Sequence, residues 1–362
     1  MNWHSKIVLF EAKQISCEIV IPFAISSETL TTANFVLVKI RDENGVTGIG
    51  EASPFPTLTG DNVAGVYPVV SSLLDQLRNL TSLAAIQHLK TLREETFLTS
   101  PSAYVGVEMA LWDLYARQLG VPLAALWGGC MLPSAVTDIT LPIMAPQNVE
   151  GFWSLFKNHG FEVLKIKVSG HLNNDLDMIH AIVKLVSKST QLTLDGNQGY
   201  QADAARTLLR RLEVSGIRPM FFEQPLPADD WTGLKWLEET TGTPICLDET
   251  VVTPENAIRV VRDQTASMIN LKIMKSGIAE TLRIIAIAQS AGISLMIGGM
   301  LESEIAMATS LQLACGIGGI QHFDLDTPFF FKDLVCEDSP WHRQKSELIR
   351  SHLPGNGLTV RH

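Results

Sequence analysis

Two lysines separated by a single residue interrupt one short apolar run of the chain. Lys165 and Lys167 in VLKIKV are two apart, so on a β-strand both side chains point to the same face. Two like charges held together in a partly buried place lower a lysine pKa toward neutrality, which is what a general base requires. A solvated edge strand would carry the same pair, so the pair alone is weak support for catalysis.

Three acidic residues lie at the ends of three successive apolar runs further along the chain. They are Asp195 in LTLDGN, Glu223 in FFEQP and Asp248 in CLDE, each about one repeat of the chain after the last. Three carboxylates converging on one space need a cation, and an all-oxygen set suits Mg²⁺ rather than zinc. The alternative is that the three acids cap helices or pair with the lysines.

Lys272 in INLKIMK lies one further repeat along, and Asp324 and Asp326 in HFDLDTP are two apart in the last apolar run. Lys167 and Lys272 are expected on opposite sides of a metal-held carboxylate, where one removes an α-proton and the other delivers a proton to the opposite face. That geometry is a racemase. The two aspartates would offer an anionic partner to a substrate ammonium and would repel dicarboxylates. The alternative is that one of them faces the helices or pairs with a lysine.

A barrel of parallel strands would bring these side chains together. From about Val136 onward the sequence repeats a short apolar run, a polar or glycine-containing turn, and a segment with helical spacing. The apolar runs are AVTDITL, VLKIKV, LTLDGN, MFFEQP, ICLDE, MINLKI, SLMIGG and HFDLD. Eight such units without a G-x-G-x-x-G turn favour a closed (β/α)₈ barrel, in which the carboxyl ends of the strands build the active site.

The first 125 residues or so have a different pattern, since ISCEIVIPF and NFVLVKIRDENGVTGIGEA suggest an antiparallel meander and AYVGVEMALWDLYARQLG a helix. We therefore predict an α/β protein with a (β/α)₈, or modified TIM, barrel and an α+β capping domain. The capping domain spans residues 1–125, the catalytic barrel 126–327, and a tail over 328–362 returns to the cap. A chain of 362 residues is long enough for two such units.

Composition limits the partners. A net charge of -10 argues against nucleic acid and against an acidic membrane surface, because phosphate binding relies on lysine and arginine. The five cysteines are an odd, scattered number with no Cys-x-x-Cys pair, and no apolar stretch reaches about 18 residues. We expect a cytoplasmic homo-oligomer that binds a small molecule.

The motifs LKIKV, LDGNQ, FEQP, LDE and NLKIMKSG, in this order and spacing, resemble the muconate-lactonizing-enzyme subgroup of the enolase superfamily. VEMALWDLYARQLGVPLAALWGG and GEASPFPTLTGD are similar to its cap-to-barrel segment and its cap loop. The resemblance implies that Lys167 and Lys272 form the acid/base pair, that Lys165 supports Lys167, and that an ene-diolate is stabilised. It also implies one Mg²⁺ per subunit, bound by Asp195, Glu223 and Asp248.

Within this subgroup, the Asp-x-Asp of the last strand is similar to that of dipeptide epimerases, such as those acting on L-Ala-D/L-Glu. This implies inversion of the α-carbon of the C-terminal residue of a dipeptide. The alternatives are an o-succinylbenzoate synthase, an N-acylamino acid racemase, or a non-catalytic binding protein on this scaffold. The expected substrate contacts are Asp324, Asp326, Thr140, Glu28, Gly299 and Leu301, with Asn197 and Glu249 supporting the metal site.

Two features depart from the pattern of that group. Ser276-Gly277-Ile278 is one glycine short of the Gly-Gly usual after the second lysine, which is expected to shift the turn. Glu28, in the first cap loop, aligns with an arginine of relatives specific for Ala-Glu. The reversed charge predicts a preference for a basic or apolar second residue over glutamate.

Overall fold

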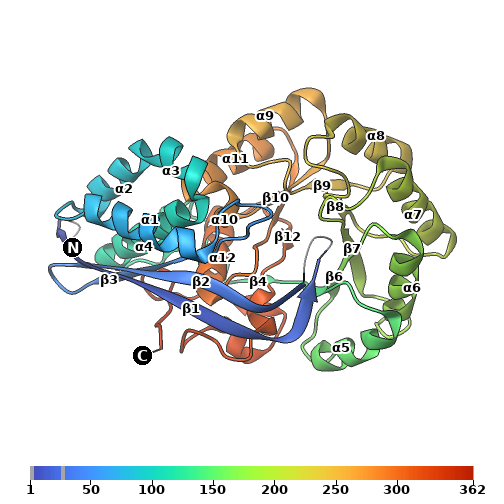
Figure 1. Cartoon of the computed structure of the whole chain (residues 1–362), viewed down its shortest axis with the longest axis horizontal. Helices are drawn as coiled ribbons and strands as arrows, with labels where there is room; N and C mark the ends of the chain where they lie inside the picture. Colours follow the sequence, from blue (N-terminus) through green and yellow to red (C-terminus); the bar gives the residue numbers. More distant parts are fainter. Residues whose placement is uncertain (1–3, 26–28, 362) are drawn as a thin grey trace.

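The computed structural model describes residues 4–25 and 29–361, and it has two parts that lie side by side, a cap and a barrel (Figure 1). The cap consists of β1 (Ile7–Ala24), β2 (Thr29–Asp42), β3 (Thr47–Ala52), α1 (Val63–Gln76), α2 (Ser82–Thr91), α3 (Arg93–Thr99) and α4 (Pro101–Leu119). Its strands pair antiparallel in the order β1-β2-β3, so the expected meander is confirmed. No helix of the described residues is long and apolar enough to cross a membrane.

Helix α4 packs closely on strand β3 because the strand carries glycine where the helix backbone approaches. A Cβ placed on Gly50 would lie 2.2 Å from the carbonyl oxygen of Gly106, and one on Gly48 would lie 2.3 Å from that of Ala110. Only glycine allows so close an approach. The alternation in β3 therefore positions α4, whose other side faces the barrel.

Eight parallel strands form the barrel in chain order, as expected. The strands are β5 (Ile139–Leu141), β6 (Val163–Lys167), β7 (Gln191–Asp195), β8 (Phe222–Glu223), β9 (Ile245–Leu247), β10 (Met268–Leu271), β11 (Ser294–Ile297) and β12 (His322–Phe323). The first and last strands meet where the Asp138 amide donates to the Phe323 carbonyl at 3.0 Å. This contact closes the barrel.

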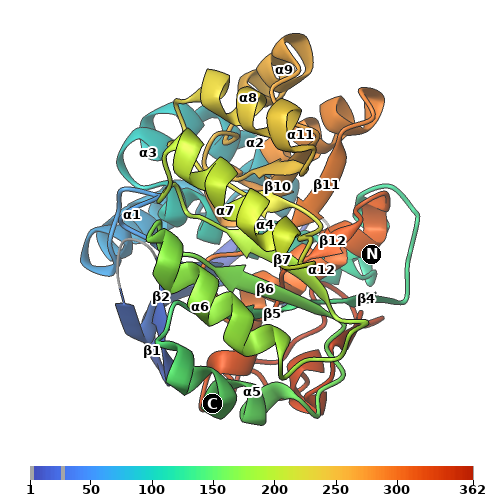
Figure 2. The same cartoon turned by 90° about the vertical axis from the view of Figure 1, so that its right-hand side faces the viewer.

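Helices cover the outside of the barrel, and Figure 2 shows α6 and α7 over β6 and β7. They are α5 (Val149–Phe156), α6 (Leu172–Val183), α7 (Ala202–Val214), α8 (Trp231–Thr241), α9 (Pro254–Asp263), α11 (Ile278–Ser290) and α12 (Glu304–Ile317), while α10 (Ile273–Ser276) is a single buried turn after β10. Short 3₁₀ turns are η1 (Leu123–Leu126), η2 (Pro146–Asn148), η3 (Thr327–Phe330) and η4 (Pro340–Arg343). Strand β12 is followed by η3 rather than by an α-helix, which is a difference from the regular repeat.

The run AVTDITL is not one strand but two, β4 (Ser134–Val136) and β5, because its two halves have different partners. β4 pairs antiparallel with β13 (Glu347–Ile349) in the tail, whereas β5 pairs with β6 in the barrel.

The chain after the barrel returns to the cap. The Lys332 amide donates to the Glu18 carbonyl at 3.0 Å, and Arg117 of α4 donates to the Leu358 carbonyl, also at 3.0 Å. The tail thus joins both parts of the molecule.

Candidate active site

A cavity of about 390 Å³ lies at the carboxyl ends of the barrel strands, under the cap. Most of its polar wall comes from the barrel, including Lys165, Lys167 and Lys272. Its apolar wall comes mainly from the cap, where the β1–β2 hairpin reaches the barrel and the Ile143 amide donates to the Ala24 carbonyl at 3.0 Å. The apolar residues are Phe23, Ile25, Leu30, Phe55 and Leu58 from the cap, with Pro227, Met300 and Leu301 from the barrel.

The three predicted metal ligands come together at the ends of neighbouring strands. Asp195 ends β7, Glu223 ends β8 beside it, and Asp248 follows β9. At most 1% of the surface of each residue is exposed. An oxygen-only set of buried carboxylates from three adjacent strands fits Mg²⁺, which prefers such ligands.

Lys165 lies among four acidic groups, and this overturns one expectation. Its Nζ is 3.0 Å from Asp195, 2.8 Å from Glu223 and 2.7 Å from Asp324. Burial by itself would lower the Lys165 pKa, but these carboxylates and Asp138 raise it well above its ordinary value. The prediction that the Lys-x-Lys pair lowers this pKa was wrong. The attraction of the contacting carboxylates outweighs the repulsion of the neighbouring lysine.

Lys167 and Lys272 lie on opposite sides of the carboxylate group. Lys167 is on β6 and Lys272 follows β10, so β7, β8 and β9, which carry the acids, stand between them. Lys167 Nζ donates to Asp195 at 2.6 Å, and Lys272 Nζ donates to Asp248 at 2.6 Å. Burial opposes the charge of Lys272, but Asp248 and Glu223 raise its pKa above the ordinary value.

The carboxylates respond to the same contacts. Burial would raise the pKa of Asp195, but Lys165 and Lys167 lower it to about 2. The pKa of Asp248 is lowered in the same way by Lys272 and Lys275. Both side chains are therefore ionised at neutral pH and available as ligands.

Asn197, expected to support the metal site, lies beside Lys167, and Glu249, expected in the same role, contacts Asn197. The side-chain oxygen of Asn197 accepts a hydrogen bond from Lys167 Nζ at 2.8 Å, and the backbone amide of Asn197 donates to the Asp195 carboxylate at 3.0 Å. Its side chain also donates to Glu249 at 3.5 Å. Burial and the charge of Asp248 raise the Glu249 pKa to about 8.

Asp324 and Asp326 both line the cavity, but not as alternate residues of a strand. Strand β12 ends at Phe323, and Asp326 already has helical backbone angles before η3. The loop turns both carboxyls inward: Asp324 accepts from Lys165, and Asp326 accepts from the Thr140 amide at 2.6 Å. Burial and Asp324 raise the Asp326 pKa to about 7.

The other predicted substrate contacts have different outcomes. Thr140, Gly299 and Leu301 line the cavity. A Cβ on Gly299 would lie 2.1 Å from Met307 Cε, so the backbone approaches the helix closely at this point. Glu28 lies outside the described residues.

Lys275 and Asn270, like Asp138, belong to the charge network and were not predicted from the sequence. Lys275 Nζ donates to the Asp248 carbonyl at 2.5 Å and to its carboxylate at 2.9 Å. Asn270 Nδ2 donates to Glu223 at 2.7 Å. Asn270 shares a strand face with Lys272, a signal that was available, whereas Lys275 reaches the site only because a helical turn begins after Lys272.

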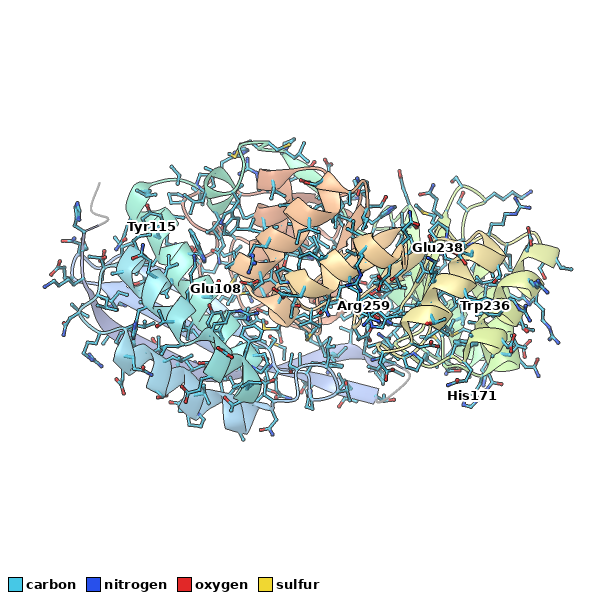
Figure 3. All side chains as sticks on the ribbon, turned by 90° about the horizontal axis from the view of Figure 1, so that it is seen from above. Glu108, Tyr115, His171, Trp236, Glu238 and Arg259 are labelled. Carbon is cyan, nitrogen blue, oxygen red and sulfur yellow. The ribbon has the colours of Figure 1, made fainter. Side chains whose placement is uncertain are left out.

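The turn over Ser276-Gly277-Ile278 is held by the cap. Gly277 has φ +83°, and the backbone amides of Ile278 and Ala279 donate to the Glu108 carboxylate at 2.6 and 3.2 Å. Glu108 lies on α4 (Figure 3) and thus caps the start of α11, where backbone amides have no partner within the helix. The cap domain therefore supports the turn that follows Lys272.

Comparisons with known proteins agree with this architecture. Residues 10–128 match "Mandelate racemase / muconate lactonizing enzyme, N-terminal domain", and residues 149–362 match "Enolase C-terminal domain-like". The chain is 34% identical to the aromatic dipeptide epimerase of Herpetosiphon aurantiacus, over 89% of this chain and 90% of that protein. It is 33% identical to the L-Ala-D/L-Glu epimerase of Bacillus subtilis, over 90% of each chain.

A solved structure is also similar over nearly the whole chain. It is that of the dipeptide epimerase from Enterococcus faecalis V583, complexed with Mg and the dipeptide L-Leu-L-Tyr. The two share 28% sequence identity with a TM-score of 0.92, covering 98% of this chain and 99% of that one.

Proposed function

The chain belongs to the mandelate racemase / muconate lactonizing enzyme family, and we propose that it is a magnesium-dependent dipeptide epimerase. One observation carries the proposal. Lys167 and Lys272 flank the carboxylates of Asp195, Glu223 and Asp248, and both lysines line a cavity whose wall also carries a pair of aspartates. The magnesium and dipeptide in the name of a similar structure support the same assignment.

We assign the metal to Asp195, Glu223 and Asp248. When bound there, Mg²⁺ would polarise the substrate carboxylate and so make the neighbouring C–H more acidic. Lys165 contacts two of these ligands and holds them in place.

Lys167 and Lys272 exchange the α-proton of the C-terminal residue from opposite faces. For one epimer Lys167 accepts the proton at the α-carbon and Lys272 donates one to the other face. For the other epimer the roles reverse, which requires a neutral Lys272, and a metal held by Asp248 and Glu223 would offset the charges that raise its pKa. Asn197, which bonds to Lys167 Nζ, orients the first of these amines.

Asp324 and Asp326 bind the α-ammonium of the dipeptide. Both are buried carboxyls on the cavity wall, and a charge-assisted hydrogen bond in such a place is strong. Neither an o-succinylbenzoate precursor nor an N-acyl amino acid carries an α-ammonium group, so these two alternatives leave the aspartates without that partner.

The side chain of the second residue of the dipeptide is apolar or basic rather than acidic. Phe23, Ile25, Leu30, Phe55 and Leu58 form the cap side of the cavity, and no lysine or arginine of the described cap residues lines it. A glutamate side chain would lose its hydration there without gaining a cation. Glu28, predicted from the sequence to oppose acidic side chains, would act in the same direction.

The test is a dipeptide library incubated in D₂O and analysed by mass spectrometry, with Mg²⁺ and with EDTA. We expect Mg²⁺-dependent deuterium incorporation at the C-terminal residue, and a higher kcat/KM for apolar or basic second residues than for Ala-Glu. Glu28→Arg should reduce the difference in kcat/KM between these dipeptides and Ala-Glu. No incorporation into any dipeptide would refute the function, and a wild-type preference for Ala-Glu would refute only the side-chain assignment.

A further inference from the structure

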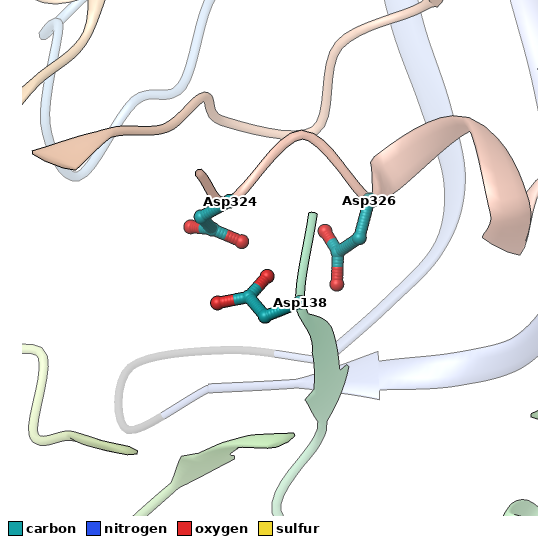
Figure 4. Close-up of side chains that lie close together, drawn as sticks. All are labelled: Asp138, Asp324 and Asp326. Atoms are coloured by element: carbon teal, nitrogen blue, oxygen red, sulfur yellow. The ribbon is translucent and has the colours of Figure 1, made fainter. Parts of the chain in front are cut away.

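A third aspartate lies behind the proposed ammonium site. Asp138 immediately precedes β5 and is two residues before Thr140. Figure 4 shows its carboxyl group and those of Asp324 and Asp326 gathered around one small space. Carboxyl oxygens from the three residues lie within 4.8 Å of one another, and the three residues are only 4%, 6% and 1% exposed, respectively.

The three acids differ in their partners. Lys165 donates to Asp324, and the Thr140 amide donates to Asp326. In contrast, Oδ1 of Asp138 is buried and accepts no hydrogen bond. Asp324 and Asp326 line the cavity, whereas Asp138 is absent from its wall, so a ligand in the cavity would meet the first two and not the third.

Three ionised carboxylates in so small a buried space would repel one another strongly. The charged groups that face Asp138 are Asp324, Asp326, Lys165 and Glu223, and the single lysine among them also pairs with the metal-site acids. Burial, followed by the charges of Asp324 and Asp326, raises the Asp138 pKa well above its ordinary value. A protonated carboxyl group can donate a hydrogen bond, which an ionised one cannot.

We propose that Asp138 is a positioning residue for the ammonium site, a neutral carboxylic acid that shares its proton with Asp324 and Asp326 and holds them toward the cavity. The proposal rests on the proposed function for its assignment of those two residues to the ammonium. With Asp138 neutral, the negative charge that remains on Asp324 and Asp326 is balanced by Lys165 and one substrate ammonium. The site therefore admits one cationic group without an excess of buried negative charge.

Replacing the neutral acid with an amide of the same shape is the direct test. Asp138→Asn keeps a neutral side chain with a hydrogen-bond donor, so its kcat/KM for a dipeptide should stay within about threefold of wild type. Asp138→Ala removes the donor and leaves Asp324 and Asp326 unsupported, so KM should rise about 10- to 100-fold while kcat changes less. If Asn and Ala impair binding equally, or if Ala has no effect, the proposal is wrong.

A second measurement needs no substrate. The infrared difference spectrum of wild type minus D138N at neutral pH should contain the carbonyl band of a protonated carboxylic acid, and its absence would overturn the proposal. Because this band is measured on the protein without substrate, it tests the protonation of Asp138 independently of the proposed epimerase function. A wild-type enzyme silent toward every dipeptide would refute the proposed function and leave the band to decide the state of Asp138.

Discussion

Lys165 connects the two halves of the site at the level of single residues. Its amine contacts Asp195 and Glu223 on the metal side and Asp324 on the ammonium side, each within 3.0 Å. A buried ammonium is unfavourable without anionic partners, and each buried carboxylate is unfavourable without a cation. The lysine and the acids therefore depend on one another, so we expect Lys165→Met to disturb both parts of the site.

The two remaining lysines of the cavity provide a stereochemical prediction. Lys167→Ala and Lys272→Ala should each stop epimerisation, lowering kcat by at least about 10²-fold, because each removes a proton carrier from one face. Each variant should still exchange the α-proton of a single epimer, and the two variants should select opposite epimers. Proton NMR in D₂O, run separately on the L,L and L,D forms of one dipeptide, makes this comparison. Exchange of the same epimer by both variants would contradict the two-face arrangement.

The acids that surround these lysines provide a prediction about metal. Asp195→Asn, Glu223→Gln and Asp248→Asn should each abolish Mg²⁺-dependent turnover, because each removes one anionic ligand from an all-carboxylate set. Calorimetric titration with Mg²⁺ should show weakened binding in all three variants. Circular dichroism should show the wild-type fold, and full activity of any variant without metal would disprove the ligand assignment.

At the scale of elements, the end of β10 and the turn into α11 link the cap to the chemistry. Lys272 follows β10, Lys275 lies in the single turn of α10, and Gly277 precedes α11. Glu108 from α4 caps that last helix, and Arg93 donates to the Ser276 carbonyl at 3.3 Å. The position of the Lys272 amine thus depends on a helix of the other part of the molecule.

Gly277→Ala tests this dependence. Gly277 has φ +83° and ψ 161°, which side chains other than glycine avoid, and an added Cβ would lie 2.9 Å from the Glu108 carboxylate. We expect a loss of about 3 kcal/mol in the free energy of unfolding together with a lower kcat. Gly45→Ala is the control for a positive φ without a steric contact, since Gly45 has φ +84° but nothing within 4 Å of its Cβ position.

The control variant should lose about 1 kcal/mol, from backbone strain alone, and should keep the wild-type kcat. Urea denaturation and steady-state kinetics measure both quantities. Equal losses for the two variants would mean that the contact with Glu108 does not support the turn.

At the scale of the whole molecule, buried acids join the cap, the barrel and the tail. Glu51 of β3 accepts from the Ser303 amide at 2.8 Å, and Glu304 of α12 accepts from the Cys336 amide at 2.6 Å. Burial raises the pKa of Glu302 to about 8 and that of Glu304 to about 7. Glu51 and Glu304 thus connect the three segments, and burial raises the pKa of both carboxyl groups.

These groups predict that stability falls as pH rises. In the unfolded chain a glutamate titrates near 4.5, so between about pH 5 and 8 unfolding releases protons that the folded protein retains at Glu302 and Glu304. The native state binds more protons there, so the free energy of unfolding decreases with pH across this window. Below about pH 4 the trend reverses in part, because Asp195, whose pKa is about 2, loses its stabilising charge on protonation.

Thermal denaturation from pH 5 to 8.5 in EDTA measures the effect. Glu302→Gln should flatten the fall in Tm with pH, whereas Glu94→Gln, on the exposed face of α3, should leave it unchanged. A wild-type Tm that rises from pH 5 to 8.5 would contradict the raised pKa values of Glu302 and Glu304.

Much of the site could be predicted from the sequence, because the alternation of side chains along a strand depends only on neighbouring residues. Lys165, Lys167, Asp195 and Glu223 occur at the ends of apolar runs, and alternate residues of a strand share a face whatever the rest of the chain does. The barrel followed for the same reason, from eight repeats of one pattern. Asn270 was equally available, two residues before Lys272.

The tertiary structure decided what depends on contacts between distant segments. No local pattern distinguishes Phe23 and Leu58, which line the cavity, from the other apolar residues of the cap. The raised pKa of Lys165 depends on Asp324, 159 residues away, whose carboxyl is turned inward by a loop and not by strand alternation. Sequence spacing determines which residues share a face, but the charge that a buried group carries depends on every neighbour that folding brings to it.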